Sequence, residues 1–169
     1  TCGDLRKENI GNKVTLVGWV HTRRDHGGLI FIDLRDRYGL SQIVFEPTHD
    51  KKLFSDAEEL RREYVIQVTG KVRQRPEGMI NPKMPTGEVE IVVDDMELIN
   101  KADTPPVDID DRKIPSEDMR LKYRYLDLRR QEMQRNIRKR HEFITAIREY
   151  ANDHYFTEIE TPMLVKPTP

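Results

Sequence analysis

The alternating pattern of residues 29–35 restricts the fold more than any other feature of this sequence. Successive side chains of a β-strand point to opposite faces, so this segment presents one apolar face, made of Ile30, Ile32 and Leu34. Phe31 falls on the opposite face, among charged residues. An aromatic ring in such surroundings can pack under a loop or a partner domain, or it can stack on a nucleic acid base. We predict a strand with Phe31 on its outer face.

Four more stretches of the first hundred residues have strand character and are bounded by turn residues: Val14–His21, Leu40–Phe45, Tyr64–Arg75 and Glu88–Ile99. Between the third and fourth strands, Leu53, Ala57, Leu60 and Tyr64 recur at helical spacing. Three strands, a helix and two strands is the order of an OB-fold. The predicted fold class is therefore mainly β with α, a five-stranded Greek-key OB-fold barrel with a helix between strands 3 and 4, followed by a hinge and a helical segment.

A nucleic acid site is predicted on one face of this barrel. OB-folds bind oligonucleotides on the face of their second and third strands, and Phe31 and Gln42 lie on those strands. Arg24, just upstream, can hold a phosphate, while an amide can read a base edge. The loop 76–87 carries three prolines and two glycines, which exclude regular structure, so it is either a binding loop or a floppy excursion.

Composition excludes several other classes. Because the chain has a single cysteine, Cys2, it cannot form an internal disulfide. This fits the reducing environment of the cytoplasm. No apolar run is long enough to span a membrane, so no membrane partner is predicted. The formal charge of −1 gives no global attraction to nucleic acid, although residues 117–140 carry nine Lys or Arg against four Asp or Glu. That run is either a solvated helical face or an RNA contact.

No catalytic constellation is predicted within the chain. It lacks a glycine-rich phosphate loop and a Cys/His zinc spacing, so no catalytic residue, metal or bound cofactor is expected. Residues 101–116 alternate prolines with acidic residues, as linkers do. We therefore predict a barrel domain at 1–103 and a hinge at 104–120. Residues 121–169 are predicted to be the start of a further domain.

Four stretches carry a resemblance to a known family: GWVHTRRDHGGLIFIDLRDRYGLSQIVF, LRREYVIQVTGKVRQRP, RLKYRYLDLRRQEMQ and FTEIETPML. In this order they closely resemble the bacterial-type aspartyl-tRNA synthetases, class II enzymes of the group called class IIb. The resemblance implies that the barrel binds the tRNA anticodon and that 121–169 opens the catalytic domain. A helix at 131–152 and a strand at 155–164 resemble its motif 1, with Pro162 at the position of a proline that borders the dimer interface.

The resemblance also implies the activity of a whole enzyme. Such an enzyme activates aspartate with ATP and Mg²⁺ and transfers it to tRNA(Asp), as a homodimer. Motifs 2 and 3, which carry the ATP-binding arginines, are expected beyond Pro169. The 169-residue chain is therefore predicted to be a fragment that has no catalytic activity of its own.

Site residues follow from the same resemblance. Phe31 resembles the ring that stacks on the middle anticodon base, Gln42 the amide that reads that uridine, and Arg24 the group that supports the base or its phosphate. Glu90 resembles the carboxylate that recognises the first-position guanine, whose two protons suit a pair of acceptors. Without the resemblance, Glu90 is predicted to be a solvent-facing strand residue.

The third anticodon base is the position at which this chain departs from the family pattern. Many bacterial members carry other residue types where His26, Gly78 and Met79 stand here. A site without a firm donor and acceptor set is expected to separate cytosine from uracil poorly, which implies charging of tRNA(Asn) as well as tRNA(Asp).

Three further residues leave alternatives open. Arg73 and Arg75 lie where the family contacts the third base and nearby backbone, or they solubilise an edge strand. With Asn81 they could also supply the missing third-base contacts. Two other functions stay open from the sequence: a free-standing OB module that binds single strands without sequence preference, and an asparaginyl or lysyl relative.

Overall fold

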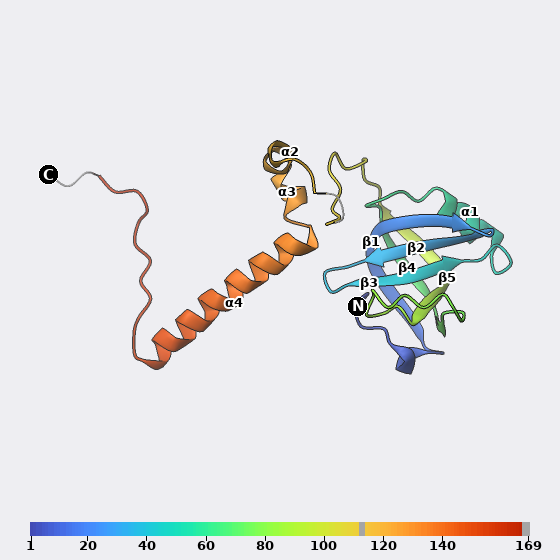
Figure 1. Ribbon diagram of the computed structural model, residues 1–169, viewed down its shortest axis with the longest axis horizontal. Helices are drawn as coiled ribbons and strands as arrows, with labels where there is room; N and C mark the ends of the chain where they lie inside the picture. The colour runs from blue at the N-terminus through green and yellow to red at the C-terminus, as the bar shows by residue number, and fades with distance from the viewer. Residues whose placement is uncertain (112–113, 167–169) are drawn as a thin grey trace. The chain divides into compact units, whose positions relative to one another are not determined.

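The computed structural model describes residues 1–111 and 114–166. Residues 112–113 of the predicted hinge and 167–169 of the predicted catalytic start lie outside the described residues. The chain divides into two compact units, Thr1–Pro105 and Pro106–Pro169 (Figure 1). Each unit has its own apolar core.

The first unit is a closed five-stranded barrel whose strands are hydrogen-bonded in the order β1-β2-β3-β5-β4. All neighbouring strands are antiparallel except β3 and β5, which are parallel. This confirms the predicted OB-fold barrel with a helix between strands 3 and 4. After a short 3-10 helix, Lys7–Asn9, the elements are β1 Lys13–His26, β2 Leu29–Arg35, β3 Leu40–Phe45, α1 Lys51–Glu58, β4 Val65–Gln74 and β5 Val89–Asn100.

The barrel interior is filled by the alternate residues of every strand. Ile30, Ile32 and Leu34 are each 0% exposed, as the pattern of residues 29–35 predicted. One glycine is required for the strands to approach this closely. A Cβ at Gly70 would lie 2.1 Å from the carbonyl oxygen of Val92, so only glycine fits between β4 and β5 at this point.

Helix α1 is shorter than the apolar spacing predicted. Asp50 caps its first turn by accepting hydrogen bonds from the backbone N–H groups of Lys52 and Leu53. At the other end the Arg61 guanidinium donates to the carbonyl oxygens of Glu58 and Leu60, which satisfies acceptors that the ending helix leaves open. The helix stops at Glu58, and Leu60 reaches the core from the following turn.

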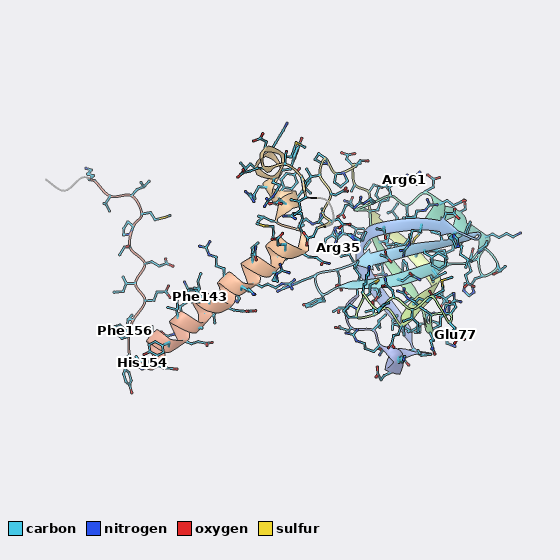
Figure 2. All side chains as sticks on the ribbon, in the orientation of Figure 1. Arg35, Arg61, Glu77, Phe143, His154 and Phe156 are labelled. Carbon is cyan, nitrogen blue, oxygen red and sulfur yellow. The ribbon has the colours of Figure 1, made fainter. Side chains whose placement is uncertain are left out.

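The described residues of the second unit form three helices, α2 Glu117–Lys122, α3 Arg124–Asp127 and α4 Gln131–Asp153, with a small apolar cluster of Val107, Ile109 and Leu126. The long helix confirms the prediction at 131–152. Its apolar side chains are largely exposed, and Phe143 is 67% exposed (Figure 2). No helix in the described part of the chain is long and apolar enough to cross a membrane.

The predicted strand at 155–164 is wrong. These residues are extended or irregular and exposed, and Pro162 lies among them. A strand needs a neighbour to satisfy its backbone N–H and C=O groups, and no strand of the described residues pairs with this segment. Of the predicted motif 1, the described residues form the helix but not the strand.

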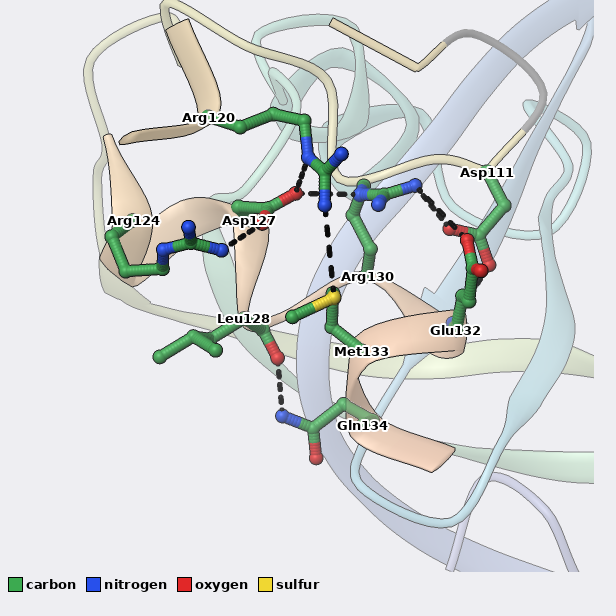
Figure 3. Close-up of polar contacts among 9 residues, drawn as sticks. All are labelled: Asp111, Arg120, Arg124, Asp127, Leu128, Arg130, Glu132, Met133 and Gln134. Carbon is green, nitrogen blue, oxygen red and sulfur yellow. Dashed lines mark hydrogen bonds and ion pairs between the residues drawn. The ribbon is translucent and has the colours of Figure 1, made fainter. Parts of the chain in front are cut away.

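A buried ionic cluster joins α2, α3 and the start of α4 (Figure 3). Asp127 is 1% exposed and accepts hydrogen bonds from Arg120 Nε at 3.0 Å, Arg124 Nη1 at 2.8 Å and Arg130 Nε at 2.9 Å. Burial raises the pKa of the Asp127 carboxyl, but the hydrogen bonds from Arg120 and Arg130 outweigh it and bring the pKa below its ordinary value. Part of the basic excess of residues 117–140 is thus structural.

Candidate nucleic-acid interface

The parallel pairing of β3 and β5 brings the two predicted base-reading groups together. Ile43 pairs in register with Ile91, and both point into the core. The preceding residues, Gln42 and Glu90, are therefore level with each other on the opposite side of their strands. Gln42 Nε2 donates to Glu90 Oε2 at 2.8 Å. Two residues that are 48 positions apart in the sequence thus form one unit.

The hydrogen bonds continue from Gln42 toward β1 and β2. Arg24 Nη2 donates to Gln42 Oε1 at 3.2 Å and to Asp33 Oδ1 at 2.8 Å. Asp33 is buried, pairs in register with Gln42 and also accepts from the Thr22 hydroxyl. The guanidinium of Arg24 is thereby held over the second and third strands.

The hydrogen bonds also continue from Glu90 toward β4. Arg73 pairs in register with Glu90, and its Nε donates to Glu90 Oε1 at 2.8 Å. Its Nη1 lies 2.7 Å from Glu46 Oε1, just after β3. Burial lowers the pKa of Arg73, but hydrogen bonds to Glu90 and Glu46 raise it above its ordinary value, so the group stays charged. We call the set Asp33, Arg24, Gln42, Glu90, Arg73 and Glu46 the polar network.

Phe31 lies beside the polar network. It pairs in register with Arg24 on β1 and with Val44 on β3. Residues directly opposite each other on neighbouring strands share a face, so Phe31 and Arg24 lie on the same side of the sheet. The ring is half-buried, while its neighbours Ile30 and Ile32 are 0% exposed. The prediction that Phe31 faces away from the core is confirmed.

Arg75 is buried rather than exposed. It is 4% exposed, and its Nε donates to the Val89 carbonyl oxygen at 3.0 Å. Burial lowers the pKa of the guanidinium, against the attraction of Glu90 and Asp33. Within the described part of the chain, nothing accepts a hydrogen bond from its Nη2. A closed barrel also has no edge at this point, so the edge-strand role considered for Arg75 is wrong.

The loop between β4 and β5 is held by its own hydrogen bonds. Asn81 N donates to the Gly87 carbonyl oxygen at 3.0 Å, and Asn81 Oδ1 accepts from Lys83 N at 3.1 Å. A Cβ at Gly87 would lie 1.8 Å from the Asn81 carbonyl oxygen, so this crossing needs glycine. The loop has a defined structure, and the Asn81 amide oxygen helps to maintain it.

The three predicted third-base residues lie outside the polar network in the described residues. His26 ends β1, opposite Leu29, and is exposed. Gly78 and Met79 are exposed in the β4–β5 loop, where Gly78 has φ +81°, a conformation that favours glycine. All three are accessible to a ligand, and none is held by a contact of the network.

Two members of the polar network were missed by the sequence analysis as functional residues. Asp33 carried a signal, because the alternation of residues 29–35 places it on the same face as Phe31. Glu46 carried none, since its contact with Arg73 depends on how the barrel closes. No group of three or more His, Cys, Asp or Glu in the described residues could hold a metal ion.

The family model of the OB-fold nucleic acid binding domain matches residues 14–99, more than half of the chain. The chain belongs to this family. A second family model, tRNA synthetases class II (D, K and N), matches residues 116–169 of the same chain. The two matches follow each other in the order that the resemblance to aspartyl-tRNA synthetases implied.

Curated relatives carry the same name. The chain is 56% identical over 168 residues to an "Aspartate--tRNA(Asp/Asn) ligase" of Moorella thermoacetica and 54% identical over 170 residues to one of Protochlamydia amoebophila. The alignments cover 99% and 100% of this chain but only 28% of each relative. The resemblance to aspartyl-tRNA synthetases is thereby confirmed for a chain that spans 28% of their length.

Solved structures agree with the fold. An asparaginyl-tRNA synthetase from Pyrococcus horikoshii superposes with a TM-score of 0.82 at 28% identity, over 97% of this chain and 36% of that one. An aspartyl tRNA synthetase from Entamoeba histolytica superposes with a TM-score of 0.87 at 24% identity, over 98% and 39%. The second likeness concerns the fold alone.

Proposed function

We propose that this chain is the anticodon-reading part of an aspartate–tRNA ligase. The observation that carries the proposal is a half-buried aromatic ring, Phe31, beside the hydrogen-bonded amide and carboxylate of Gln42 and Glu90. A stacking surface next to base-edge donors and acceptors is the arrangement with which proteins read unpaired bases. The family matches and the names of the relatives support the same function.

The proposed roles follow from the chemistry of each group. Phe31 stacks on the middle base, and Gln42 reads that base as uridine. Arg24, on the same face, supports the base or its phosphate. Glu90 accepts the two Watson–Crick protons of a first-position guanine. Arg75 has a buried donor without a partner in the described residues, which suits a carbonyl or phosphate oxygen near the third base.

Glu90 is covered in the free chain. Its 1% exposure means that a guanine reaches the carboxylate only when a bonded side chain moves aside. The side chain of Arg73 is 39% exposed, so it is already in contact with solvent. Arg73 can keep its ion pair with Glu46 while the guanine replaces Arg73 at Glu90. We therefore assign Arg73 to this carboxylate in preference to the third base.

The whole enzyme is proposed to activate aspartate with ATP and Mg²⁺ and to transfer it to tRNA in the cytoplasm. We propose that it works as a homodimer, with Pro162 near the subunit boundary. Its tRNA partners are proposed to be tRNA(Asp) and tRNA(Asn), in agreement with the names of its relatives. The proposed limits of the anticodon-binding domain, the hinge and the catalytic start are 1–103, 104–120 and 121–169.

First-base recognition tests the function directly. The chain is expected to bind an anticodon stem-loop with guanine at the first position about tenfold or more tightly than one with adenine, which lacks the two protons that a carboxylate accepts. Glu90→Ala removes this preference, whereas Glu97→Ala, at an exposed position of the same strand, retains it. Titrations of both stem-loops measure the ratio. Equal affinity for every anticodon variant would identify a non-specific single-strand module instead.

Third-base recognition tests the proposed tRNA range. His26, Gly78 and Met79 provide no fixed donor and acceptor pair, so cytosine and uracil at the third position should differ by less than the roughly 1–3 kcal/mol of a good bidentate contact. Stem-loops that differ only at this base give the binding ratio, and charging of both tRNAs by the full enzyme gives the activity. A preference for cytosine of about a hundredfold or more would contradict the dual specificity.

A further inference from the structure

The amide of Gln42 lies between two charged groups of opposite hydrogen-bonding character. Its Nε2 donates to Glu90 Oε2 at 2.8 Å, and its Oε1 accepts from Arg24 Nη2 at 3.2 Å. An ionised carboxylate only accepts hydrogen bonds, and a guanidinium only donates them. A reversed amide would place donor against donor at Arg24 and acceptor against acceptor at Glu90. Only one orientation of the Gln42 side chain satisfies both neighbours.

This orientation decides which base the amide can read. An amide has two N–H donors and two lone pairs, so one of each remains after these two bonds. Uracil presents an N3–H donor and an O4 acceptor, and cytosine presents an N3 acceptor and an N4–H donor. The two bases therefore require opposite orientations of the same amide. A fixed amide reads one of them, and an amide that can reverse reads both.

The flanking charges are themselves held in place. In the free chain Glu90 is 1% exposed and is anchored on its other oxygen by Arg73 Nε at 2.8 Å, the place that the proposed guanine takes when RNA binds. Arg24 is anchored by the buried carboxylate of Asp33 at 2.8 Å. Hydrogen bonds to charged groups are about twice as strong as neutral ones, and burial strengthens them further. The polar network thus restrains both groups that orient Gln42.

We infer that Glu90 and Arg24 are positioning residues for Gln42, and that they set the preference for uracil over cytosine at the middle anticodon base. This inference rests on the proposed function and deepens it. Glu90 then serves two bases, because it accepts from the first-position guanine and also orients the reader of the second. Discrimination at the two positions is coupled through one carboxylate.

The test measures the uracil-to-cytosine affinity ratio at the middle position. The full 169-residue chain is titrated with two stem-loops that differ only at that base. In Glu90→Gln the new amide can both donate and accept, so it no longer dictates the orientation of Gln42. The ratio is expected to fall about tenfold. Any loss of the first-base contact affects both stem-loops equally and cancels in the ratio.

A pair of substitutions tests the role of Arg24, which contacts the other end of the Gln42 amide. The Arg24 side chain is 52% exposed, so its replacement leaves the barrel core unchanged. Arg24→Lys still only donates and should retain most of the ratio, whereas Arg24→Gln should lose it. Glu97→Gln makes the same chemical change as Glu90→Gln at an exposed position of β5 and should leave the ratio unchanged. A thermal melt of each variant monitors folding. If Glu90→Gln does not fold, the two Arg24 variants alone test the inference.

The outcomes separate the inference from the function on which it rests. Equal binding of both stem-loops by the unmodified chain would refute uracil reading, and the inference with it. A clear preference in the unmodified chain that survives in both Glu90→Gln and Arg24→Gln would overturn the inference alone. A fall that is specific to the middle base in these two variants supports it.

Discussion

Replacement of Asp127 by asparagine is expected to destabilise residues 120–134 by about 3 kcal/mol, the lower end of the cost of breaking a buried ion pair. The carboxylate accepts hydrogen bonds from Arg120, Arg124 and Arg130. An amide cannot neutralise them, and within the described residues Arg130, at 1% exposed, would keep only its ion pairs with Asp111 and Glu132. Amide hydrogen exchange in this segment should accelerate about a hundredfold.

Asp118→Asn is the matched control, because Asp118 is an exposed residue of the first turn of α2. It should leave exchange unchanged. Acidification of the unmodified chain gives a second measurement. The lowered pKa of Asp127 means that its contribution to stability is complete above the unfolded pKa of about 3.9 and is lost as the pH falls through the folded pKa. Exchange in Asp127→Asn as slow as in the control would refute the role of this cluster.

Phe31→Ala is expected to weaken binding of the anticodon stem-loop by roughly 1–3 kcal/mol, the usual contribution of one base stacked on an aromatic ring. The barrel should stay folded, because Ile30, Ile32 and Leu34 supply the core on the other face of β2. Titration with the stem-loop gives the affinity, and a thermal melt gives the stability.

Two further variants at Phe31 distinguish base stacking on the aromatic ring from the effect of apolar side-chain volume. Phe31→Tyr keeps an aromatic face and should bind almost as the unmodified chain does, while Phe31→Leu keeps apolar volume without a ring and should lose most of the effect. Affinity that is unchanged in Phe31→Ala would exclude stacking. A large loss of stability in the same variant would show that the ring is part of the core.

Local features of this fold could be predicted from the sequence because they depend on neighbouring residues. The outer position of Phe31 and the buried position of Ile32 follow from strand alternation in seven residues. The long helix α4 follows from its apolar spacing in the same way. The end of α1 was missed because the pattern runs on through Leu60, which packs into the core without being helical.

The contacts of the candidate site could not be predicted in this way. Gln42 and Glu90 are 48 residues apart, and the hydrogen bond between them depends on the parallel register of β3 and β5. A shift of that register by one residue would turn one of the side chains to the other face. Alternation alone predicted an exposed Glu90, whereas closure of the barrel buries it.

The seam between β3 and β5 is short, with only two residue pairs in its ladder, Ile43 with Ile91 and Val44 with Val92. A barrel that opened along this seam would become one continuous sheet in the order β3-β2-β1-β4-β5, with β3 and β5 at its two edges. Phe31 and Arg24 would stay together on the sheet, while Gln42 and Glu90 would part. If Gln42 and Glu90 read anticodon bases as proposed, the accuracy of that reading depends on barrel closure.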